Sequence, residues 1–465
     1  MVLLGTGTNN LSSTASNVIS GNRIRDNGRA ASASGIWLQY GAYYNRIGGS
    51  AAADRNFIFN NVGDGIRIES SNSNGILGNT IGSQTSAQYN NTGSGIRIDA
   101  GEDNWIGGLA PVAAAGNDIG GNDQDGIALT NGTHKTTITR NLIGSDEYGV
   151  PRKNGASGIS IQSGSYSTTI GTGNAVDRNV IAGNALHGIR IDGATTTSNT
   201  LRYNDIGLNT DPSLTGCPCT VAVPNGGFGL VLQNNAHHNR LEGANYIAYN
   251  GSGGVWVLTG AHDNLLGQDP VSGVANDEIF ANTGSGILFS DAQWNLVRRA
   301  SIYNNSHDGI EQNSSGSNNS WISTTTYLNG GLGIDIGTTA NDNTPTAGYP
   351  VITSVVRAGG VVSVTGTSDT TFFNNFANYR TTTVYLLHGG LDPSGYGEGS
   401  ILAGSASTNA SGVWRVVYAE GATPLCYAAY KRVVASNGLA FSDAGSEFSL
   451  STCTPKKAYV PMVVR

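Results

Sequence analysis

The chain has 465 residues, of which 67 are glycine and only 12% are charged, and its formal net charge is −7. An acidic balance without a run of lysine or arginine argues against a nucleic-acid partner, and no apolar stretch is long enough to span a bilayer. Few charges together with abundant Gly, Asn, Ser and Thr are typical of exported β-rich proteins rather than cytosolic enzymes. We therefore expect an extracellular or cell-surface location.

The first residues, Met1–Gly5, lack the charged start and the long apolar segment of a signal peptide. Residues 17–22, Asn-Val-Ile-Ser-Gly-Asn, already read as the third strand of a repeat. We expect a fragment whose leader and N-terminal cap are not present in this chain. The alternative is that the first coil stacks on something else.

One short phrase then recurs ten times: Asn, three residues, Gly and a branched aliphatic residue. Subtracting the numbers of successive glycines gives steps of 23 to 41 residues, a length that indicates a solenoid. In a solenoid, any functional site lies on a surface built from equivalent positions of successive repeats. The pairs are Asn61/Gly65, Asn91/Gly95, Asn122/Gly126, Asn154/Gly158, Asn184/Gly188, Asn225/Gly229, Asn250/Gly254, Asn282/Gly286, Asn305/Gly309 and Asn329/Gly333.

Each repeat contains three short strands and no sustained helical period. Each Gly opens an alternating strand such as Ile66–Glu69, and segments such as Asn104–Gly108 and Asn56–Asn60 supply the second and third strands. Three strands per turn predict an all-β, right-handed, three-stranded parallel β-helix over residues 1–340. At the corners we expect Gly to supply positive φ, and a column of Asn amides to hydrogen-bond from coil to coil.

One repeat is longer than the others, with a step of 41 residues between Gly188 and Gly229. It contains Cys217-Pro218-Cys219, which we interpret as a loop staple or as free thiols. A metal pair is conceivable, but no further ligand with zinc spacing is nearby, and a disulfide across one intervening residue would be strained.

After a linker over residues 341–349 the pattern changes to short strands separated by turn residues. This spacing predicts an antiparallel β-sandwich over residues 350–453. Cys426 and Cys453 are expected to form a disulfide of an exported domain. The tail, residues 454–465, is either the last strand of this sandwich or a segment for strand donation or anchoring.

At the repeated glycines the chain resembles the right-handed parallel β-helix repeat proteins, which include pectate lyases, polygalacturonases, alginate epimerases, phage tailspikes and many bacterial surface proteins. The resemblance implies a fold more than a function. Asp392–Gly399, Leu402–Ser405 and Ser446–Ser449 resemble an immunoglobulin-like module that often follows such β-helices in exported, adhesin-like bacterial proteins. That module implies no catalytic residues, and the run Phe372–Tyr379 departs from its pattern.

The outward residues of the first strand offer candidate catalytic groups. Arg67 and Arg97 should lie one coil apart, with Glu69 and Asp99 beside them. A polysaccharide lyase needs such a set, because a cation neutralises a uronate carboxylate while a base removes the adjacent proton. The competing interpretation is a surface salt lattice, since the same column continues as Ala128 and Ser160.

Other acid and histidine positions are less suggestive of chemistry. Asp123 and Asp125 form an acidic pair of the kind used in glycoside hydrolysis, although the rest of the polygalacturonase pattern is missing. His187 occupies a slot filled by serine in other coils, so we interpret it as a turn residue. His237 and His238 form an exposed corner pair.

Trp37, Tyr40, Trp105 and Trp256 are expected to point outward, where sugar rings could stack on them, although scattered exposed aromatics are also ordinary. Asp335, Asp342 and Asn343 could bind Ca²⁺ at the junction between the two parts, or form a solvated hinge. No other cofactor is expected.

The sequence thus favours an exported structural or adhesive protein that presents a long face to a polysaccharide or cell-surface glycan, without enzymatic activity. The first alternative is a lyase or hydrolase acting on an acidic polysaccharide. The second is a filament or surface layer assembled by end-to-end association of solenoids.

Overall fold

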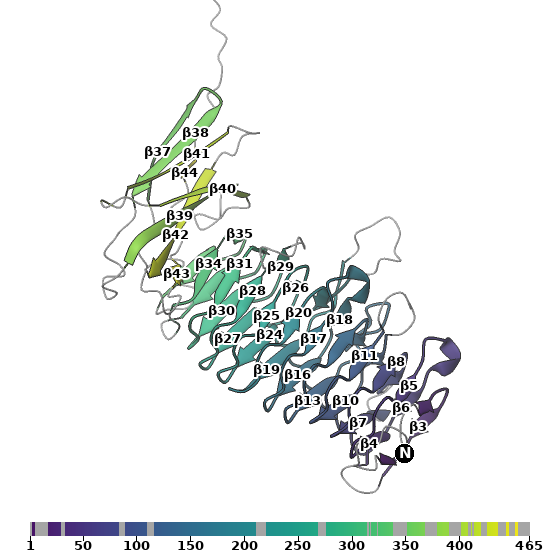
Figure 1. Ribbon diagram of the computed structural model, residues 1–465. Helices are drawn as coiled ribbons and strands as arrows, with labels where there is room; N and C mark the ends of the chain where they lie inside the picture. Colours follow the sequence, from purple (N-terminus) through teal and green to yellow (C-terminus); the bar gives the residue numbers. More distant parts are fainter. Residues whose placement is uncertain are drawn as a thin grey trace, which may run out of the picture.

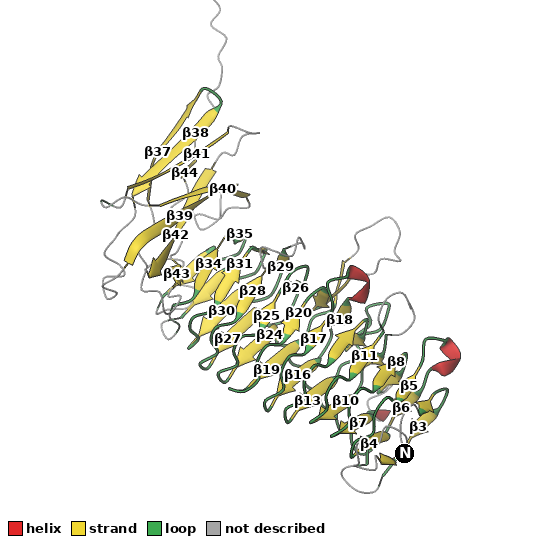
Figure 2. Ribbon diagram, viewed as in Figure 1, coloured by secondary structure: helices red, strands yellow, loops and turns green. Residues whose placement is uncertain are grey.

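A computed structural model shows an elongated stack of coils followed by a smaller all-antiparallel part (Figures 1 and 2). The described residues are 2–4, 17–28, 33–82, 89–108, 116–210, 220–267, 276–313, 316, 318–322, 324–337, 351–367, 379–389, 401–407, 411, 413–419, 426–435, 443–445 and 452–453. Within them, three long parallel sheets run the length of the stack, and each coil contributes one strand to each sheet. The predicted all-β, three-sheet parallel β-helix is confirmed.

We name the three sheets A, B and C in the order in which a coil visits them. Sheet A contains β1 (Val2–Leu4), β4 (Ile36–Gln39), β7 (Ile66–Glu69), β10 (Ile96–Asp99), β13 (Ile127–Thr130), β16 (Ile159–Gln162), β19 (Ile189–Asp192), β24 (Phe228–Gln233), β27 (Gly253–Leu258), β30 (Ile287–Ser290), β33 (Ile310–Gln312) and β36 (Ile334–Ile336). Sheet B contains β2 (Val18–Ile19), β5 (Arg46–Gly48), β8 (Gly75–Leu77), β11 (Trp105–Gly107), β14 (Thr137–Thr139), β17 (Thr169–Ile170), β20 (Thr200–Leu201), β25 (Arg240–Leu241), β28 (Leu265–Gly267), β31 (Leu296–Arg298) and β34 (Ser320–Ile322). Sheet C contains β3 (Arg23–Arg25), β6 (Phe57–Phe59), β9 (Thr80–Ile81), β12 (Asp118–Ile119), β15 (Leu142–Ile143), β18 (Asn179–Ile181), β21 (Asn204–Ile206), β26 (Tyr246–Ala248), β29 (Asp277–Phe280), β32 (Ala300–Tyr303) and β35 (Thr325–Tyr327).

Residues with the same position in successive coils lie next to one another. Ile96, for example, pairs with Ile66 on one side and with Ile127 on the other. Neighbouring strands in a sheet are about 4.8 Å apart, so each outward or inward position becomes a column along the axis. The sequence pattern therefore maps directly onto surfaces.

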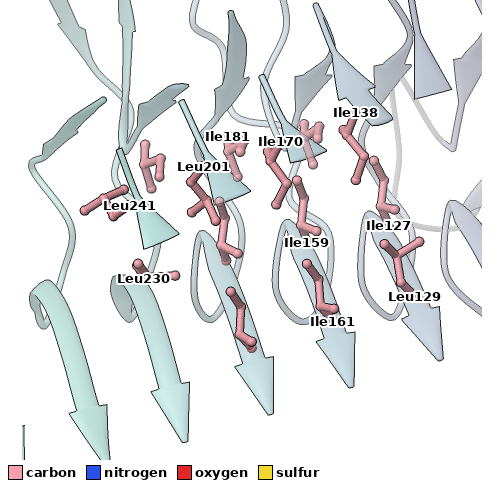
Figure 3. Close-up of a cluster of buried hydrophobic side chains, with 14 of the residues drawn as sticks. Ile127, Leu129, Ile138, Ile159, Ile161, Ile170, Ile181, Leu201, Leu230 and Leu241 are labelled. Atoms are coloured by element: carbon pink, nitrogen blue, oxygen red, sulfur yellow. The ribbon is translucent and has the colours of Figure 1, made fainter. Parts of the chain in front are cut away.

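The core consists of columns of inward aliphatic side chains. Ile159 and Ile161 of sheet A meet Ile170 of sheet B and Ile181 of sheet C, and all four are fully buried (Figure 3). β-branched side chains suit such a pleated, close-packed surface. Burying each one contributes about 1.5–3 kcal/mol relative to leaving it in water.

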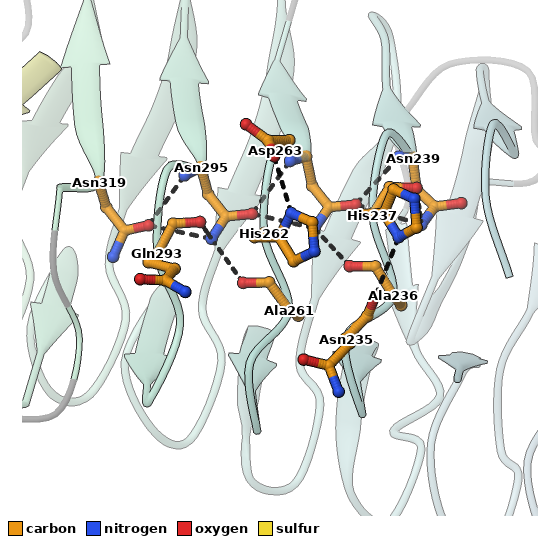
Figure 4. A network of polar contacts seen from close by, with 11 residues as sticks. Asn235, Ala236, His237, Asn239, Ala261, His262, Asp263, Gln293, Asn295 and Asn319 are labelled. Carbon is orange, nitrogen blue, oxygen red and sulfur yellow. Dashed lines mark hydrogen bonds and ion pairs between the residues drawn. The ribbon is translucent and has the colours of Figure 1, made fainter. Parts of the chain in front are cut away.

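Asparagine columns hold the corners, as predicted. At the corner before sheet A, each Asn Nδ2 donates to the Oδ1 of the next Asn at 2.8–3.0 Å. The column comprises Asn27, Asn61, Asn91, Asn122, Asn154, Asn184, Asn225, Asn250, Asn282, Asn305 and Asn329. Similar columns stand before sheets B and C, and Figure 4 shows Asn239, Asn295 and Asn319 of the former.

The expectation that corner glycines supply positive φ holds for glycines such as Gly78 (φ 67°) and Gly121 (φ 72°), which precede column asparagines, but not for the repeated glycines. Those glycines that precede the sheet A strands do not have positive φ. A Cβ on Gly95 would lie 2.7 Å from the carbonyl oxygen of Gly126 and 2.9 Å from Nδ2 of Asn122, so the next coil excludes any side chain. Positive φ instead occurs at the residue before many column asparagines, for example Asn60 (φ 54°) and Tyr249 (φ 60°).

The N-terminal strand assignment is also corrected. Val18–Ile19 is β2, a strand of sheet B, and the third strand of that coil is β3. The two positions resemble each other in sequence because an Asn precedes each strand, Asn17 in one case and Asn22 in the other, and both asparagines belong to columns.

The 41-residue repeat inserts an antiparallel hairpin, β22 (Leu208–Thr210) with β23 (Thr220–Ala222), between sheet C and the next sheet A strand. Val223, directly after it, packs on Val180 and Ala182 on the outside of sheet C. Cys217 and Cys219 lie outside the described residues. Two 3₁₀ turns, η1 (Ala52–Asp54) and η3 (Ala175–Asp177), precede strands of sheet C.

The predicted C-terminal strands are present and antiparallel. One sheet has the order β37 (Val351–Ala358), β38 (Val361–Thr367), β41 (Val413–Ala419). The other has the order β40 (Ile401–Ser407), β39 (Tyr379–Gly389), β42 (Cys426–Ala435), β43 (Asp443–Gly445), with β44 (Thr452–Cys453) also on β42. Val362, Val364, Trp414 and Val416 form a small core. Residues 341–349 and 454–465 lie outside the described residues.

The pairing of β42 with β44 sharpens the disulfide prediction, because it sets Cys426 directly opposite Cys453. Opposed residues of antiparallel strands have Cα atoms about 4.5–5.5 Å apart, a separation that suits a disulfide. We expect peptide mapping without reductant to recover a Cys426–Cys453 crosslink. Alkylation of either residue in the unreduced, folded protein would contradict the prediction.

The asparagine column before sheet C ends in an acid, which makes stability depend on pH. Asp277 is fully buried and accepts hydrogen bonds from the backbone N–H groups of Gly243 (3.0 Å) and Asn245 (2.9 Å) and from Asn245 Nδ2 (2.7 Å). Burial raises the pKa of Asp277 from 3.8 to about 6. The following coil carries Ala300 at this position. Alanine has no side-chain acceptor, so residue 277 does not need the donor group that an asparagine would supply.

Because the folded pKa of Asp277 is the higher one, its protonation favours the folded state. This stabilisation is complete below pH 3.8 and is lost as the pH rises through 6; a shift of two units corresponds to about 3 kcal/mol. We expect the melting temperature of Asp277→Asn to change less between pH 4 and 6 than that of the wild type. A loss of stability from the altered contact with the Gly243 N–H would not affect this comparison of slopes. The exposed control Asp123→Asn should leave the wild-type slope, and an unchanged slope in Asp277→Asn would refute the assignment.

Candidate functional site

The outer surface of sheet A between β4 and β27 carries the four predicted catalytic candidates within three columns of side chains, and we call it the sheet A face. The first column precedes the strand glycines: Ser34, Asp64, Ser94, Asp125, Ser157, His187 and Phe228. The second is Trp37, Arg67, Arg97, Ala128, Ser160, Arg190, Val231 and Trp256. The third is Gln39, Glu69, Asp99, Thr130, Gln162, Asp192 and Gln233.

The four predicted catalytic candidates come together as an ion-pair lattice. Arg67 lies 3.5 Å from both Glu69 and Asp99, and Arg97 lies 3.8 Å from Asp99. Asp99 also accepts a 2.6 Å hydrogen bond from Asn131. Asp99 is therefore engaged on several sides, which favours the salt-lattice interpretation for the acids while leaving Arg97 the most exposed of the arginines of this face.

Trp37 closes the N-terminal end of this lattice. Its Nε1 donates to Glu69 at 3.1 Å, and the Arg67 guanidinium carbon lies 4.9 Å from the ring centroid, a cation–π arrangement. One face of the indole is thus occupied by Arg67.

Between Arg97 and Arg190 the second column carries only the small, buried residues Ala128 and Ser160. Three strand steps separate the arginines, about 14 Å along the axis. We call this stretch the central interval. Arg190 leans back into it, donating to Ser160 Oγ (3.0 Å) and Gln162 Oε1 (2.9 Å), and Thr130 Oγ1 is buried there without a hydrogen-bond partner among the described residues.

Two carboxylates of the first column border the lattice and the central interval. Asp64 accepts from the Ser94 N–H (2.8 Å) and Asp125 from the Ser157 N–H (2.9 Å). Burial raises the pKa of both carboxyls, an effect that these hydrogen bonds and nearby arginines only partly offset. Carboxyls with raised pKa values are candidate proton-transfer groups.

Sequence reasoning missed Asp64 and misassigned the partner of Asp125. Asp123 is exposed and accepts from Asn90 (2.8 Å), whereas Asp125 belongs to the sheet A face, so the two do not act on a common partner. The available signal was the slot before the repeated Gly, where Asp interrupts a run of Ser.

His187 was interpreted as a turn residue, but its ring lies on the sheet A face. Nδ1 accepts a 3.1 Å hydrogen bond from the Phe228 N–H, and Phe228 in turn stacks on Trp256 with centroids 4.9 Å apart. Gly227 makes room for the imidazole, since a Cβ there would lie 2.5 Å from Nδ1. Burial, with a smaller effect of Arg190, lowers the pKa of His187.

The four predicted glycan-binding aromatics do not form one patch. Trp37 and Trp256 lie at opposite ends of the sheet A face, seven strand steps or about 34 Å apart. Tyr40 follows β4 and is 60% exposed, while Trp105 is 43% exposed on sheet B, where its ring covers Gly75.

The proposed calcium ligands are only partly described. Asp335 is buried in β36 opposite Glu311, and Asp342 and Asn343 lie outside the described residues. The described ranges hold no group of three or more His, Cys, Asp or Glu residues arranged to bind a metal ion.

The predicted corner histidines, His237 and His238, meet edge to face with ring centroids 4.9 Å apart. His237 stacks on His262 at 4.8 Å, His237 Nδ1 contacts the Asn235 carbonyl oxygen, and His262 contacts Asp263 (Figure 4). No helix in the described part of the chain has the length and apolar character needed to cross a membrane.

No protein-family model and no curated protein sequence matches the chain. Among solved structures it is similar to a periplasmic alginate epimerase at 12% identity and a TM-score of 0.38, covering 70% of this chain and 66% of that one. It is also similar to a mannuronan C-5 epimerase A-module from Azotobacter vinelandii (14%, TM-score 0.36, covering 70% and 83%) and an α-1,3-glucanase catalytic unit from Streptomyces thermodiastaticus (13%, TM-score 0.33, covering 70% and 63%). At this level of similarity, function has to be inferred from the residues of the chain itself.

The lattice predicts that Arg97 contributes little to stability. Its pair with Asp99 is long and half-exposed, and such pairs contribute about 0–1 kcal/mol. We expect Arg97→Ala to leave the melting temperature nearly unchanged. Arg140→Ala, which breaks a buried 3.0 Å pair with Asp177, should lower it clearly more. Equal losses in the two variants would show that Arg97 is a structural residue.

Proposed function

We propose that the sheet A face binds an extended acidic polysaccharide and that the central interval acts on its uronate units. The observation that carries the proposal is Asp125, a half-buried carboxyl bordering a stretch of small residues that Arg97 and Arg190 flank. This set combines a group able to accept a proton with two cations able to hold a carboxylate.

Binding follows from the geometry of the solenoid. A column of equivalent positions offers the same kind of contact at successive coils, which suits a polymer made of repeated units. Trp37 lies at one end of the sheet A face, and the Phe228–Trp256 stack lies at the other end. Aromatic side chains that combine an apolar ring with a polar N–H suit sugar rings, which have apolar and hydroxyl-bearing parts.

The reaction we propose begins when Asp125 removes the proton from the carbon next to the uronate carboxylate. Arg97 and Arg190 stabilise the enolate that this creates. In a lyase, the bond from the neighbouring carbon to the glycosidic oxygen then breaks, a carbon–carbon double bond forms, and the leaving oxygen takes up a proton. The net reaction is cleavage of the polymer without the addition of water.

The alternative is adhesion without turnover. The pairing of Arg67 and Arg97 with Asp99 supports it, because these arginines are already neutralised within the protein. Under this alternative the chain is a secreted or cell-surface protein in which residues 350–453 form an immunoglobulin-like module and the β-helix, residues 1–340, displays the glycan-binding face. End-to-end association of solenoids into a filament is a second alternative.

A panel of uronate-containing polysaccharides separates turnover from adhesion. We expect ultraviolet absorbance from unsaturated products with at least one of them, a loss of at least 100-fold in Asp125→Asn and a large loss in Arg97→Ala. Arg46→Ala, an exposed arginine on sheet B, should retain wild-type activity.

Binding on a glycan array without turnover would replace the reaction with the adhesive alternative. Absence of both binding and turnover would exclude the glycan function. Full activity in Asp125→Asn would remove Asp125 from the mechanism.

A further inference from the structure

The hydrogen bond between His187 and Phe228 determines which nitrogen of the imidazole carries the proton. A neutral imidazole has one N–H donor and one acceptor nitrogen. The Phe228 N–H points at His187 Nδ1 from 3.1 Å, and a backbone amide is always a donor. Nδ1 must therefore be the acceptor, and Nε2 must carry the hydrogen.

Steric contacts keep the ring in this orientation. The imidazole covers Gly227, where a Cβ would lie 2.5 Å from Nδ1 and 2.9 Å from Cε1. On the far side of Phe228, Gly253 gives the phenyl ring the same room, with a hypothetical Cβ 2.5 Å from Phe228 Cε1. The next two coils are thus shaped to hold the ring where its Nδ1 meets the Phe228 amide.

The surroundings also oppose a second proton. A proton on Nδ1 would face the Phe228 N–H and remove the hydrogen bond. The ring is half-buried, and the guanidinium of Arg190, on the same coil, repels a positive charge on the imidazole. The acids of this part of the face are engaged elsewhere: Asp192 with Arg190, Gln233 and Asn234, and Asp125 with the Ser157 N–H.

We propose that His187 acts as a neutral hydrogen-bond donor, through Nε2–H, to a carboxylate oxygen of the bound uronate, and that it does not act as the base. The assignment rests on the proposed function for its ligand and on the structure alone for its protonation. The proposal gives the residues around the central interval separate roles. Asp125 accepts the proton, while His187 and Arg190 contact the carboxylate oxygen on which negative charge develops. Removing one such donor typically costs on the order of 10²–10³ in kcat.

The protonation state can be tested without any substrate. In the full chain labelled with ¹⁵N-histidine, the signals lost in His187→Gln identify His187. We expect a pyridine-like shift for Nδ1 and a pyrrole-like shift for Nε2, unchanged from neutral pH to well below the ordinary histidine pKa. Gly227→Ala should keep the fold and move these signals, because the added Cβ displaces the ring. The opposite tautomer, or a protonated ring at neutral pH, would overturn the assignment.

The role toward substrate is tested by comparing two substitutions. Glutamine can accept from the Phe228 N–H and still donate, so His187→Gln should retain roughly a tenth or more of wild-type turnover of the active polysaccharide, whereas His187→Ala should lose on the order of 100-fold. His307→Gln, at an exposed turn position, is the matched control and should behave as wild type. Equal loss in the glutamine and alanine variants would show that His187 works as a base.

If the wild-type protein turns over no polysaccharide, the same variants are compared by their affinity for an oligouronate. His187→Ala should then bind at least tenfold more weakly than His187→Gln. Absence of both turnover and binding in the wild type defeats the proposed function and the substrate contact together. The nitrogen spectrum decides the tautomer in either case.

Discussion

The whole molecule depends on the stacking of coils at the spacing of parallel strands. Each residue lies about 4.8 Å from its equivalents in the two neighbouring coils, so every side chain has to be compatible with copies of its own position. Isoleucine satisfies this in the core by packing on itself. Asparagine satisfies it at the corners, because an amide both donates and accepts, so that a column of amides satisfies its own members. Charges fit least easily, and on the sheet A face arginine and acid therefore alternate between neighbouring columns.

The same constraint indicates where function can arise. Side chains in a column of similar residues contact one another, as in the Phe280–Tyr303–Tyr327 stack on sheet C, where each ring stacks on the next. Their ring faces are then not available to a ligand. Side chains that are not engaged with copies of themselves occur where the repetition is interrupted. The central interval is such an interruption, because Ala128 and Ser160 stand where the flanking coils carry arginine. Asp125 and His187 are interruptions of the serine column beside it.

Periodicity made the fold and the outward columns predictable from sequence, and the register confirms which residues neighbour Arg67 and Arg97. The prediction failed where a residue's role depends on the next coil rather than on its own. Gly95 looked like a positive-φ corner, but it is required by a carbonyl one coil away. Asp64 was missed and His187 was interpreted as a turn residue because the sequence does not show whether a slot before a strand opens onto a face. Only the three-dimensional register joins His187 to the Phe228 amide, 41 residues further along the chain.

Glycines outside the repeated phrase carry a second kind of information. His187 lies over Gly227, Phe228 over Gly253 and Trp105 over Gly75, so in each case a ring leans along the axis onto a coil whose residue lacks a side chain. At a spacing of about 4.8 Å, a ring that lies along the axis collides with any Cβ beneath it. A glycine one coil away from an outward aromatic residue or histidine therefore indicates a ring that lies flat on the surface. Without such a glycine, the ring stacks on its own column. For His187 this pairing with Gly227 is what directs Nδ1 to the backbone and leaves Nε2–H as the ring's donor.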